Sequence, residues 1–438
     1  MKRATLLSTA IFAMTVILAS VARAQDPDPP SKIEVGIQFS SLTFRPPQPP
    51  NSAIFVGITT EAGFGGRFTF NLNKHVSLEA EGNFFPHESF NDPAGRGRVL
   101  QGQFGVKAGK RFGKFGIFAK ARPGFLSFSK ALTVIGTATY FDFNGQPFTY
   151  PVFGERRKTR FSMDLGGVLE FYPSRKLLTR IDVGDTIVFH GADSLFPFGL
   201  SVRPRNRTDH NVQVSAGIGF RFGSLPPKEI TPVANNHREK RFEVGGQFSS
   251  LVLREVEHFP VGIPLFSPGA DYYDTVSQPG FGGRFTYNLT PNFALEVQSD
   301  FYPTEVRLIN NGRAGGRILQ GQAGVKAGKR FEKFGVFAKA RPGVVSFAKS
   351  IEVSGIDPTF GFPIFRQTRK NYFSMDLGGV LEFYPSPRIV TRFDGGDTMI
   401  RYRSTELPIV FFPTTQSLHV PAETTHNFQF SAGVGFRF

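Results

Sequence analysis

The stretch VQVSAGIGFRF at residues 212–222 alternates between apolar and small or polar side chains, and FQFSAGVGFRF at 428–438 repeats the pattern. In an extended strand the apolar residues share one face, whereas Gln213, Ser215 and Arg221 share the other. A period of two is typical of a β-strand with two unlike faces. Both stretches are therefore predicted to be strands, and the fold depends on which face is turned inward.

The rest of the chain also occurs as two similar copies. EVGIQFSSL at 34–42 returns as EVGGQFSSL at 243–251, and FSMDLGGVLEFYPS occurs at both 161–174 and 373–386. A period of roughly 210–220 residues is far longer than a solenoid unit, so it predicts duplication of a whole domain. The predicted divisions are an export signal at 1–24, a Pro-rich leader at 25–31, a first barrel repeat at 32–222, a periplasmic linker at 223–240 and a second barrel repeat at 241–438.

Composition and the first residues narrow the class of protein. Met1, Lys2 and Arg3 precede an apolar stretch, and Ala22 and Ala24 supply the small residues that signal peptidase accepts, so export is expected. No later apolar run reaches the length of about 18 residues that a membrane-spanning helix needs. The chain has 51 Phe and 48 Gly, which favours strands, and it has no Cys, which excludes disulfides and thiolate metal sites.

Turn lengths predict how the strands connect. The first copy breaks into about eight strand-like segments, of which three pairs are joined by tight turns near 73–74, 113–114 and 174–176. The other connections are long and polar, at 45–62, 87–97, 131–158 and 191–209. Short and long connections in alternation predict antiparallel neighbours in sequence order. We therefore expect an all-β fold of two tandem antiparallel up-and-down eight-stranded transmembrane β-barrels, with one sixteen-stranded barrel as the alternative.

Glycines and phenylalanines indicate which face is inside. Gly36, Gly105 and Gly166 share the polar face, and small residues must alternate with large ones inside a narrow barrel. The apolar face is too rich in Phe for that interior and suits lipid instead. The polar face then forms a charged lumen. In the first copy it comprises Glu34, Arg67, Glu79, Glu81, Lys107, Arg111, Lys120, Arg122, Asp164, Glu170, Arg180, Asp182 and Arg221. In the second it comprises Glu243, Arg284, Glu296, Lys326, Arg330, Lys339, Arg341, Asp376, Glu382, Arg392, Asp394 and Arg437, with Gln298 in place of Glu81 and Asp300 in place of Asn83.

So many charges in a narrow, poorly hydrated space are tolerated only when they are paired. Lys120 and Arg122 face inward on the fifth predicted strand, and Asp164 and Glu170 face inward on the sixth, which the meander places next to it. We therefore expect ion pairs across that boundary. Pro123 follows at a position where the strand ladder is expected to be interrupted, because proline has no N–H to donate.

Aromatic pairs stand where strands meet turns and predict an interfacial girdle, as NFFP at 83–86 and FYP at 171–173, 301–303 and 383–385. With these features the chain resembles, twice over, the eight-stranded outer-membrane β-barrel family of Gram-negative bacteria, the OmpA/OmpX-like barrels. The ending SAGVGFRF is similar to the terminal-strand signal of that family. The resemblance implies that Phe436 and Phe438 are read by the outer-membrane assembly machinery. It also implies a place in the cell outer membrane, periplasmic termini and extracellular long loops.

Three classes of function fit such a barrel: a non-enzymatic envelope or surface-interaction protein, a porin-like channel for small or anionic solutes, and a lipid-modifying enzyme. A paired lumen argues against the channel. The enzyme needs a His beside a Ser or a carboxylate, and only His210 and His426 occupy matching positions in the two copies. We therefore expect the first class, with no catalytic residue, no cofactor and no metal.

Basic residues near the long connections predict a partner. Arg98 and Arg157 in the first copy correspond to Arg317 and Arg369 in the second, and arginine makes bidentate contacts to phosphate. Outer-membrane lipid, including lipopolysaccharide phosphates, is therefore the expected partner. The net charge of +16 is spread along an exported chain rather than gathered in one patch, which argues against nucleic acid.

Overall fold

The computed structural model of the chain describes residues 31–44, 58–89, 97–141, 145–191, 206–223, 240–257, 272–357, 363–411 and 414–438. The predicted export signal with its cleavage residues Ala22 and Ala24, the leader up to residue 30, and residues 224–239 of the predicted linker lie outside these ranges. In the described part of the chain, no helix is long and apolar enough to cross a membrane.

Eight strands of the first repeat close into a barrel. They are β1 (Ile33–Phe44), β2 (Thr59–Asn71), β3 (Val76–Ser89), β4 (Gly97–Arg111), β5 (Phe115–Phe141), β6 (Pro147–Phe171), β7 (Leu177–His190) and β8 (Arg207–Phe222). Each strand pairs antiparallel with its neighbour in sequence. The last strand returns to the first, with Ile37 opposite Ile218, so that the sheet has no free edge along this length.

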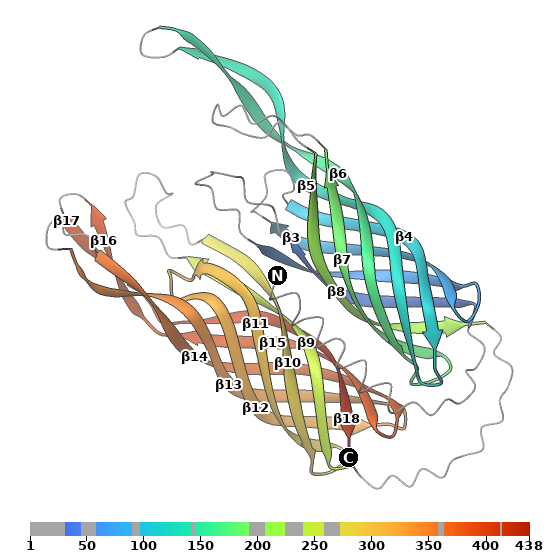
Figure 1. Cartoon of the computed structure of the whole chain (residues 1–438). Helices are drawn as coiled ribbons and strands as arrows, with labels where there is room; N and C mark the ends of the chain where they lie inside the picture. The colour runs from blue at the N-terminus through green and yellow to red at the C-terminus, as the bar shows by residue number, and fades with distance from the viewer. Residues whose placement is uncertain are drawn as a thin grey trace, which may run out of the picture.

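The second repeat closes in the same way. Its strands are β9 (Phe242–Glu257), β10 (Tyr272–Asn288), β11 (Phe293–Ile309), β12 (Ala314–Arg330), β13 (Phe334–Ile356), β14 (Pro363–Ser386), β15 (Ile389–Tyr402) and β18 (Glu423–Arg437). Strand β18 pairs with both β15 and β9. Two separate eight-stranded barrels are thus confirmed, and the alternative of one sixteen-stranded barrel is wrong. Figure 1 shows the barrels side by side, with their tight turns at the same end.

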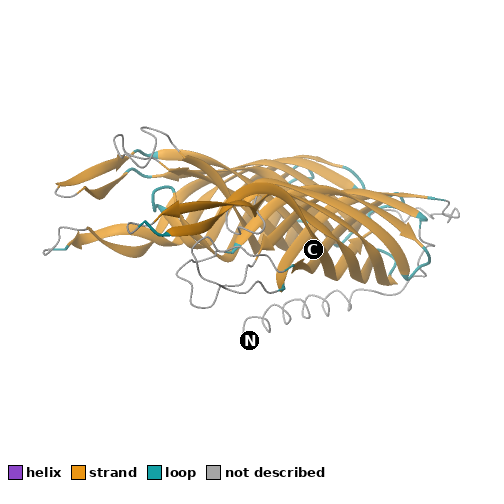
Figure 2. Cartoon of the chain, turned by 90° about the horizontal axis from the view of Figure 1, so that it is seen from above, coloured by secondary structure: helices purple, strands orange, loops and turns teal. Residues whose placement is uncertain are grey.

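The long connections contain more strand than the sequence analysis expected. Residues 131–158 were predicted to be a loop, but β5 continues to Phe141 and β6 begins at Pro147, so only a short turn separates them. The segment ALTVIGTATYF at 131–141 is rich in β-branched and aromatic residues, which favour strands. Strands β13 and β14 extend similarly, and β16 (Thr405–Phe411) pairs with β17 (Thr414–Val420) in a hairpin outside the barrel. These ribbons project beyond the barrel ends in Figure 2.

The two faces of the barrel wall differ sharply in chemistry. The outward side chains of the first barrel include Phe64, Phe104 and Phe220, which are 61%, 60% and 60% exposed. The inward side chains include Glu79, Arg122 and Asp164, which are completely buried. An ordinary soluble protein has the opposite arrangement. The apolar belt therefore faces outward and the charges face inward, as the glycine and phenylalanine pattern predicts.

Gly105 and Pro123 both lie next to Arg122, the glycine on the neighbouring strand and the proline one residue later in the chain. A Cβ on Gly105 would lie 2.1 Å from the carbonyl oxygen of Ala121, so no larger residue fits there without a shift of the backbone. The β4–β5 ladder has pairs at Gln103 and Val106 but none between them, where Pro123 stands on the opposite strand. The interruption expected at this proline is confirmed.

The predicted aromatic girdle is wrong for six of its eight rings, because four point inward and two are buried between the barrels. Because neighbouring residues of a strand face opposite ways, each pair sends one ring out and one ring in. Phe85 and Tyr302 are completely buried inside the barrels, and Tyr172 and Tyr384 donate hydrogen bonds to inward carboxylates. The outward rings of Phe171 and Phe383 are buried too, in clusters that also hold residues of the other barrel.

Candidate functional site in the barrel lumen

The candidate site is the interior of each barrel, which changes character along its length. We call the end with the β2–β3, β4–β5 and β6–β7 turns the tight-turn end, and the opposite end the long-connection end. Charged side chains fill the half nearer the tight-turn end, and uncharged amides and hydroxyls follow. Apolar side chains lie at the long-connection end together with a few buried charged groups, such as the His190–Asp209 pair at 3.0 Å. Every charged residue predicted for the lumen within 32–222 and 241–438 projects inward and is buried or nearly so.

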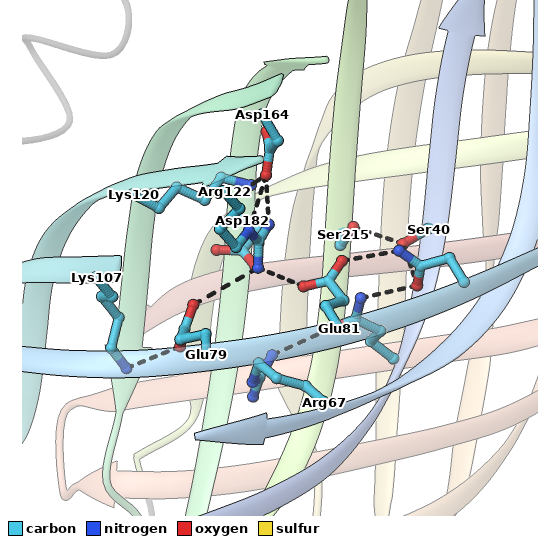
Figure 3. A network of polar contacts seen from close by, with 12 residues as sticks. Ser40, Arg67, Glu79, Glu81, Lys107, Lys120, Arg122, Asp164, Asp182 and Ser215 are labelled. Atoms are coloured by element: carbon cyan, nitrogen blue, oxygen red, sulfur yellow. Dashed lines mark hydrogen bonds and ion pairs between the residues drawn. The ribbon is translucent and has the colours of Figure 1, made fainter. Parts of the chain in front are cut away.

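Arg122 on β5 lies at the centre of the first lumen (Figure 3). Its Nη1 donates to Glu81 Oε2 at 2.5 Å, and its Nε and Nη2 donate to Asp164 Oδ2 at 3.0 and 2.5 Å. Lys120 Nζ lies 2.8 Å from the same Asp164 oxygen. Asp164 is thus held by both bases of β5, which confirms one of the two ion pairs expected between β5 and β6.

The other expected partner, Glu170, is used differently. It forms an ion pair with Lys107 of β4 and lies 3.6 Å from Arg180 of β7. The prediction that Glu170 pairs with the two bases of β5 is therefore wrong. Glu170 stands nearer the tight-turn end than Asp164, at the level of Gly116 rather than Arg122. At that level the basic neighbours of Glu170 are Lys107 of β4 and Arg180 of β7.

Glu79 of β3 joins the opposite walls of the barrel. Arg180 on β7 donates to both of its carboxylate oxygens, the Nη2 bond being 2.9 Å long, and its Nε donates to Asp182 at 3.1 Å. Lys107 Nζ lies 3.3 Å from Glu79 as well. Because β3 and β7 are not neighbours in the sheet, these bonds cross the lumen. The interior at this level is a linked set of charges rather than an open passage.

The tight-turn end is closed by cations stacked on aromatic rings. The Arg221 guanidinium lies 4.7 Å from the centre of the Tyr172 ring, and its Nε is 3.5 Å from Glu34. Arg111 lies over Phe118 at 5.0 Å and donates to Asn71 Oδ1 at 2.7 Å. A guanidinium over an aromatic face is favourable, more so where water is excluded.

An uncharged polar layer lies next to the charges. Asn83 accepts from Gln38 at 2.9 Å and donates to Glu81 and Gln101, both at 2.8 Å. Gln101 and Gln213 bond to each other across the lumen at 2.9 Å. The predicted set was limited to charged residues and therefore missed this layer. The alternation that found the charges places these amides on the same inward face.

Clusters of apolar side chains lie inside the barrels near the long-connection end. In the first barrel Leu42, Phe85, Val99, Leu126 and Val188 form one buried cluster with Phe128. The second barrel has a larger cluster that includes Leu253, Tyr302, Phe347, Tyr372 and Tyr402. Sequence alternation could not find this cap, because the inward positions become apolar here while the outward ones are mixed, as with Ser41 and Phe84. The lumen thus holds a charge network near the tight-turn end and an apolar cluster nearer the long-connection end, with the His190–Asp209 pair beside that cluster.

The second barrel repeats the network with one change. Arg341 donates to Asp376 at 2.9 and 2.5 Å, Lys339 lies 2.9 Å from Asp376, and Arg392 donates to Glu296 and Asp394. The remaining ion pairs are Lys326 with Glu382 at 2.5 Å, Arg437 with Glu243 at 3.1 Å and Arg330 with Glu243 at 3.5 Å. Arg284 donates to Gln247 at 3.2 Å, as Arg67 does to Gln38 at 3.1 Å. The change is at Gln298, which accepts from Arg341 in place of a carboxylate.

The residues considered for an enzyme lie outside the lumen. His210 Nδ1 is 2.6 Å from Asp185, and His426 Nδ1 is 2.5 Å from Asp397, in each case on the outward face near the long-connection end. Both imidazoles are largely exposed. In the described part of the chain, no group of His, Asp and Glu has the arrangement of a metal site.

The proposed assembly residues lie on the last strand. Phe438 N donates to Phe242 O at 2.9 Å, and Phe242 N donates back at 3.1 Å, so the terminal residue continues the β18–β9 ladder. Phe436 and Phe438 stack at 6.4 Å between ring centres, and Phe438 is 56% exposed on the outer surface. Their role as an assembly signal stays a prediction.

Comparisons with known proteins give weak likenesses to outer-membrane barrels. No protein-family model matches the chain, and no curated protein matches it in sequence. Among solved structures, Neisserial surface protein A is 9% identical with a TM-score of 0.27, covering 44% of this chain and 98% of that one. The attachment invasion locus protein Ail of Yersinia pestis is 12% identical with a TM-score of 0.24, covering 44% and 99%. The monoaromatic hydrocarbon channel CymD is 7% identical with a TM-score of 0.27, covering 93% and 89%. All these values are low, and the functional inference below rests on the chain's own residues.

Proposed function

We propose that the chain is a non-enzymatic integral protein of the outer membrane whose two barrels are closed and act through their exposed ends. The single observation that carries this proposal is the inverted wall, with phenylalanines outside and paired charges inside. A belt of exposed Phe, Leu and Val is stable only against an apolar solvent. Strands of this length are sufficient to cross a bilayer at the tilt that barrels adopt.

The contents of the lumen favour a closed barrel over a channel. Bonds from Arg180 to Glu79 and from Gln101 to Gln213 join strands on different sides of the interior. The apolar cluster around Phe85 lies beyond them and replaces the polar lining over that part of the lumen. An ion entering from either end would therefore have to pass both the bonds that cross the lumen and the apolar cluster. We infer that the barrels do not conduct.

Two measurements test the proposal. The folded protein is expected to need detergent for extraction and to migrate faster on a gel before boiling than after it, whereas recovery in a detergent-free periplasmic fraction would contradict a membrane location. Purified protein in planar bilayers is expected to give no stable conductance. Steady channels in the nanosiemens range would replace this proposal by the porin-like alternative for small or anionic solutes.

We further propose that lipid phosphates bind at an outward arginine band. Arg98 and Arg157 are exposed on the outer face of the first barrel, on the long-connection side of Leu100 and Phe161. Arg317 and Arg369 occupy the matching places on the second barrel. A guanidinium just above an apolar belt is placed to contact headgroup phosphate bidentately. Lipopolysaccharide phosphate is the expected ligand in the outer leaflet.

The arginine band is tested by neutralisation. Replacing all four arginines by Gln is expected to lower the lipopolysaccharide that co-purifies with the barrel while the gel shift on boiling is unchanged. Replacing Lys110, Lys114, Lys329 and Lys333 by Gln is the control, because these four residues are exposed at the tight-turn ends and the change removes the same number of charges. Equal loss of lipopolysaccharide in both sets would mean that net charge, rather than the band, holds the lipid.

A further inference from the structure

The two barrels touch along faces that are built from the same positions of the repeat. Thr179 Oγ1 donates to Thr391 Oγ1 at 3.1 Å. Thr179 stands in LLTRIDVGD at 177–185, and Thr391 stands at the same place in IVTRFDGGD at 389–397. A residue can contact its own counterpart only close to a two-fold axis that relates the two units. The threonine pair therefore marks one point of such an axis.

A second pair of counterparts marks another point. Thr60 of β2 forms a strand bridge with Ser277 of β10, near the long-connection ends of both barrels. These residues occupy equal places in TTEAGFGGRF at 59–68 and VSQPGFGGRF at 276–285. Thr179 and Thr391 lie near the tight-turn ends instead. The line through the two points therefore runs along the length of the barrels, which stand in parallel in Figure 1.

The apolar packing between these points is reciprocal. In one cluster Leu177 and Ile218 of the first barrel are grouped with Leu381 and Phe383 of the second. The other cluster groups their counterparts with the barrels exchanged: Ile389 and Val434 of the second barrel with Leu169 and Phe171 of the first. Contacts that recur with the partners exchanged are the mark of an isologous interface, the kind found in two-fold dimers.

The matching faces are not identical, and the largest differences are at three positions. Ile181, Val212 and Val214 of the first barrel correspond to Phe393, Phe428 and Phe430 of the second. Phe430 stacks on Phe39 of the first barrel with ring centres 4.2 Å apart. The first face thus carries small side chains where the second carries rings. If two first barrels met through this face, gaps would remain at these positions. If two second barrels met through it, too many rings would be crowded together.

We propose that the chain is a fused dimer of barrels, paired about a two-fold axis, and that each face takes the other barrel of the same chain as its partner. The paired face excludes lipid, so the two barrels move in the membrane as one body. The size difference between the faces favours pairing within the chain over pairing between two molecules.

Cysteine crosslinking of the full-length protein in membranes tests this proposal, because the native chain has no Cys. The double variants Thr179→Cys/Thr391→Cys and Thr60→Cys/Ser277→Cys are each expected to form a disulfide within one molecule on mild oxidation. The control is Val106→Cys/Val325→Cys, which also joins counterparts, on β4 and β12. The control pair is expected to give no intramolecular product.

The outcomes divide cleanly. Intramolecular products from both test pairs, and not from the control, support the axis and the partner. Products of doubled mass from the test pairs would show pairing between molecules and overturn the assignment of the partner. No product above the control from either pair would overturn the interface itself. The gel shift on boiling identifies any variant that has not folded, and the two test pairs lie at opposite ends of the interface, so one remains informative without the other.

A second variant tests the size difference. Ile181→Phe/Val214→Phe gives the first barrel the ring-bearing face of the second and is expected to slow formation of the Thr179→Cys/Thr391→Cys disulfide. Val106→Phe adds a ring away from the interface and is expected to leave the rate unchanged. Equal rates for both would show that the small side chains of the first face have no part in choosing the partner.

Discussion

The two barrels carry the same network with one carboxylate in a different place. In the first, Glu81 accepts from Arg122, and Asn83 donates its amide to Glu81 at 2.8 Å. In the second, Gln298 stands where Glu81 does and Asp300 where Asn83 does, and the amide of Gln298 donates to Asp300 at 2.6 Å. Carboxylate and amide have traded places two residues apart on one strand.

The exchange shows which requirement the lumens of both barrels meet. Asp300 accepts from Gln247 at 2.8 Å and Ser249 at 3.1 Å, so the displaced carboxylate has its own set of donors. A buried carboxylate is tolerated when its oxygens are hydrogen-bonded, and an amide can replace it beside an arginine because its carbonyl oxygen still accepts. What the two barrels share is a set of donors for each exchanged carboxylate, rather than a fixed pattern of ion pairs.

The largest expected effect is at the central arginines. Arg122→Ala would leave Glu81 and Asp164 buried without their main donor, which costs about 3–5 kcal/mol of the free energy of unfolding where water is excluded. Arg341→Ala would leave one carboxylate, Asp376, and the neutral Gln298, so its cost is expected to be smaller. Urea unfolding in detergent measures both.

The assay for these variants can separate the barrels because the native chain has no Trp. A single Phe104→Trp or Phe285→Trp change on the outer belt makes fluorescence report one barrel at a time. The exposed Arg98→Ala is the matched control, and Arg205→Ala, whose position is outside the described residues, is expected to behave similarly. Equal costs for Arg122→Ala and Arg98→Ala would mean that the lumen is wet and the porin-like alternative should be taken up.

The next effect tests the exchange itself. Glu81→Gln alone removes a charge-assisted hydrogen bond from Arg122 and is expected to cost about 2 kcal/mol. Adding Asn83→Asp gives the first barrel the arrangement of the second, so most of that loss should be regained. A double-mutant cycle measures the coupling between the two positions. Strictly additive costs would contradict the idea that amide and carboxylate act as one exchangeable pair.

The smallest expected effect is in the apolar caps. Tyr302 is the counterpart of Phe85, and its hydroxyl donates to Gln320 at 3.0 Å. Tyr302→Phe makes the second cap chemically similar to the first and also removes the bond that the hydroxyl accepts from Gln429 at 3.2 Å. Gln320 and Gln429 stay bonded to each other at 3.1 Å, so the expected cost is about 1 kcal/mol. The tryptophan reporter on the second barrel measures it. A cost above that of Glu81→Gln would indicate that the hydroxyl supports more of the amide layer than its bonds to Gln320 and Gln429.

The sequence predicts the barrel wall well because period-two alternation is a local property. Residues such as Glu79 and Asp164 are found on the inward face from their spacing alone, and the repeats reveal the second barrel. The ion-pair partner of each charged residue is harder to predict, since Glu170 pairs with Lys107 of β4 rather than with a base on the neighbouring strand β5. Barrel curvature brings these strands together, and no local pattern records it.

Two further features escape a reading of the sequence for physical reasons. The inward cap around Phe85 is apolar while the outward positions beside it are mixed, so polarity no longer distinguishes inside from outside at this level. The face around Thr179 is apolar like the rest of the exterior, and nothing in composition separates a surface that meets lipid from one that meets another barrel. Only the placement of equivalent positions next to each other in space reveals it.

The ribbon formed by β5 and β6 places its tip far from the barrel. Beyond Phe128, β5 pairs with β6 alone and continues to Phe141, which is 70% exposed. At about 3.3 Å per residue this stretch is roughly 40 Å long, comparable to the thickness of a whole bilayer with its headgroups. The ring of Phe141 is thus carried well clear of the barrel on a hydrogen-bonded arm. A molecule that contacts Phe141 can therefore stay farther from the barrel than the thickness of a membrane.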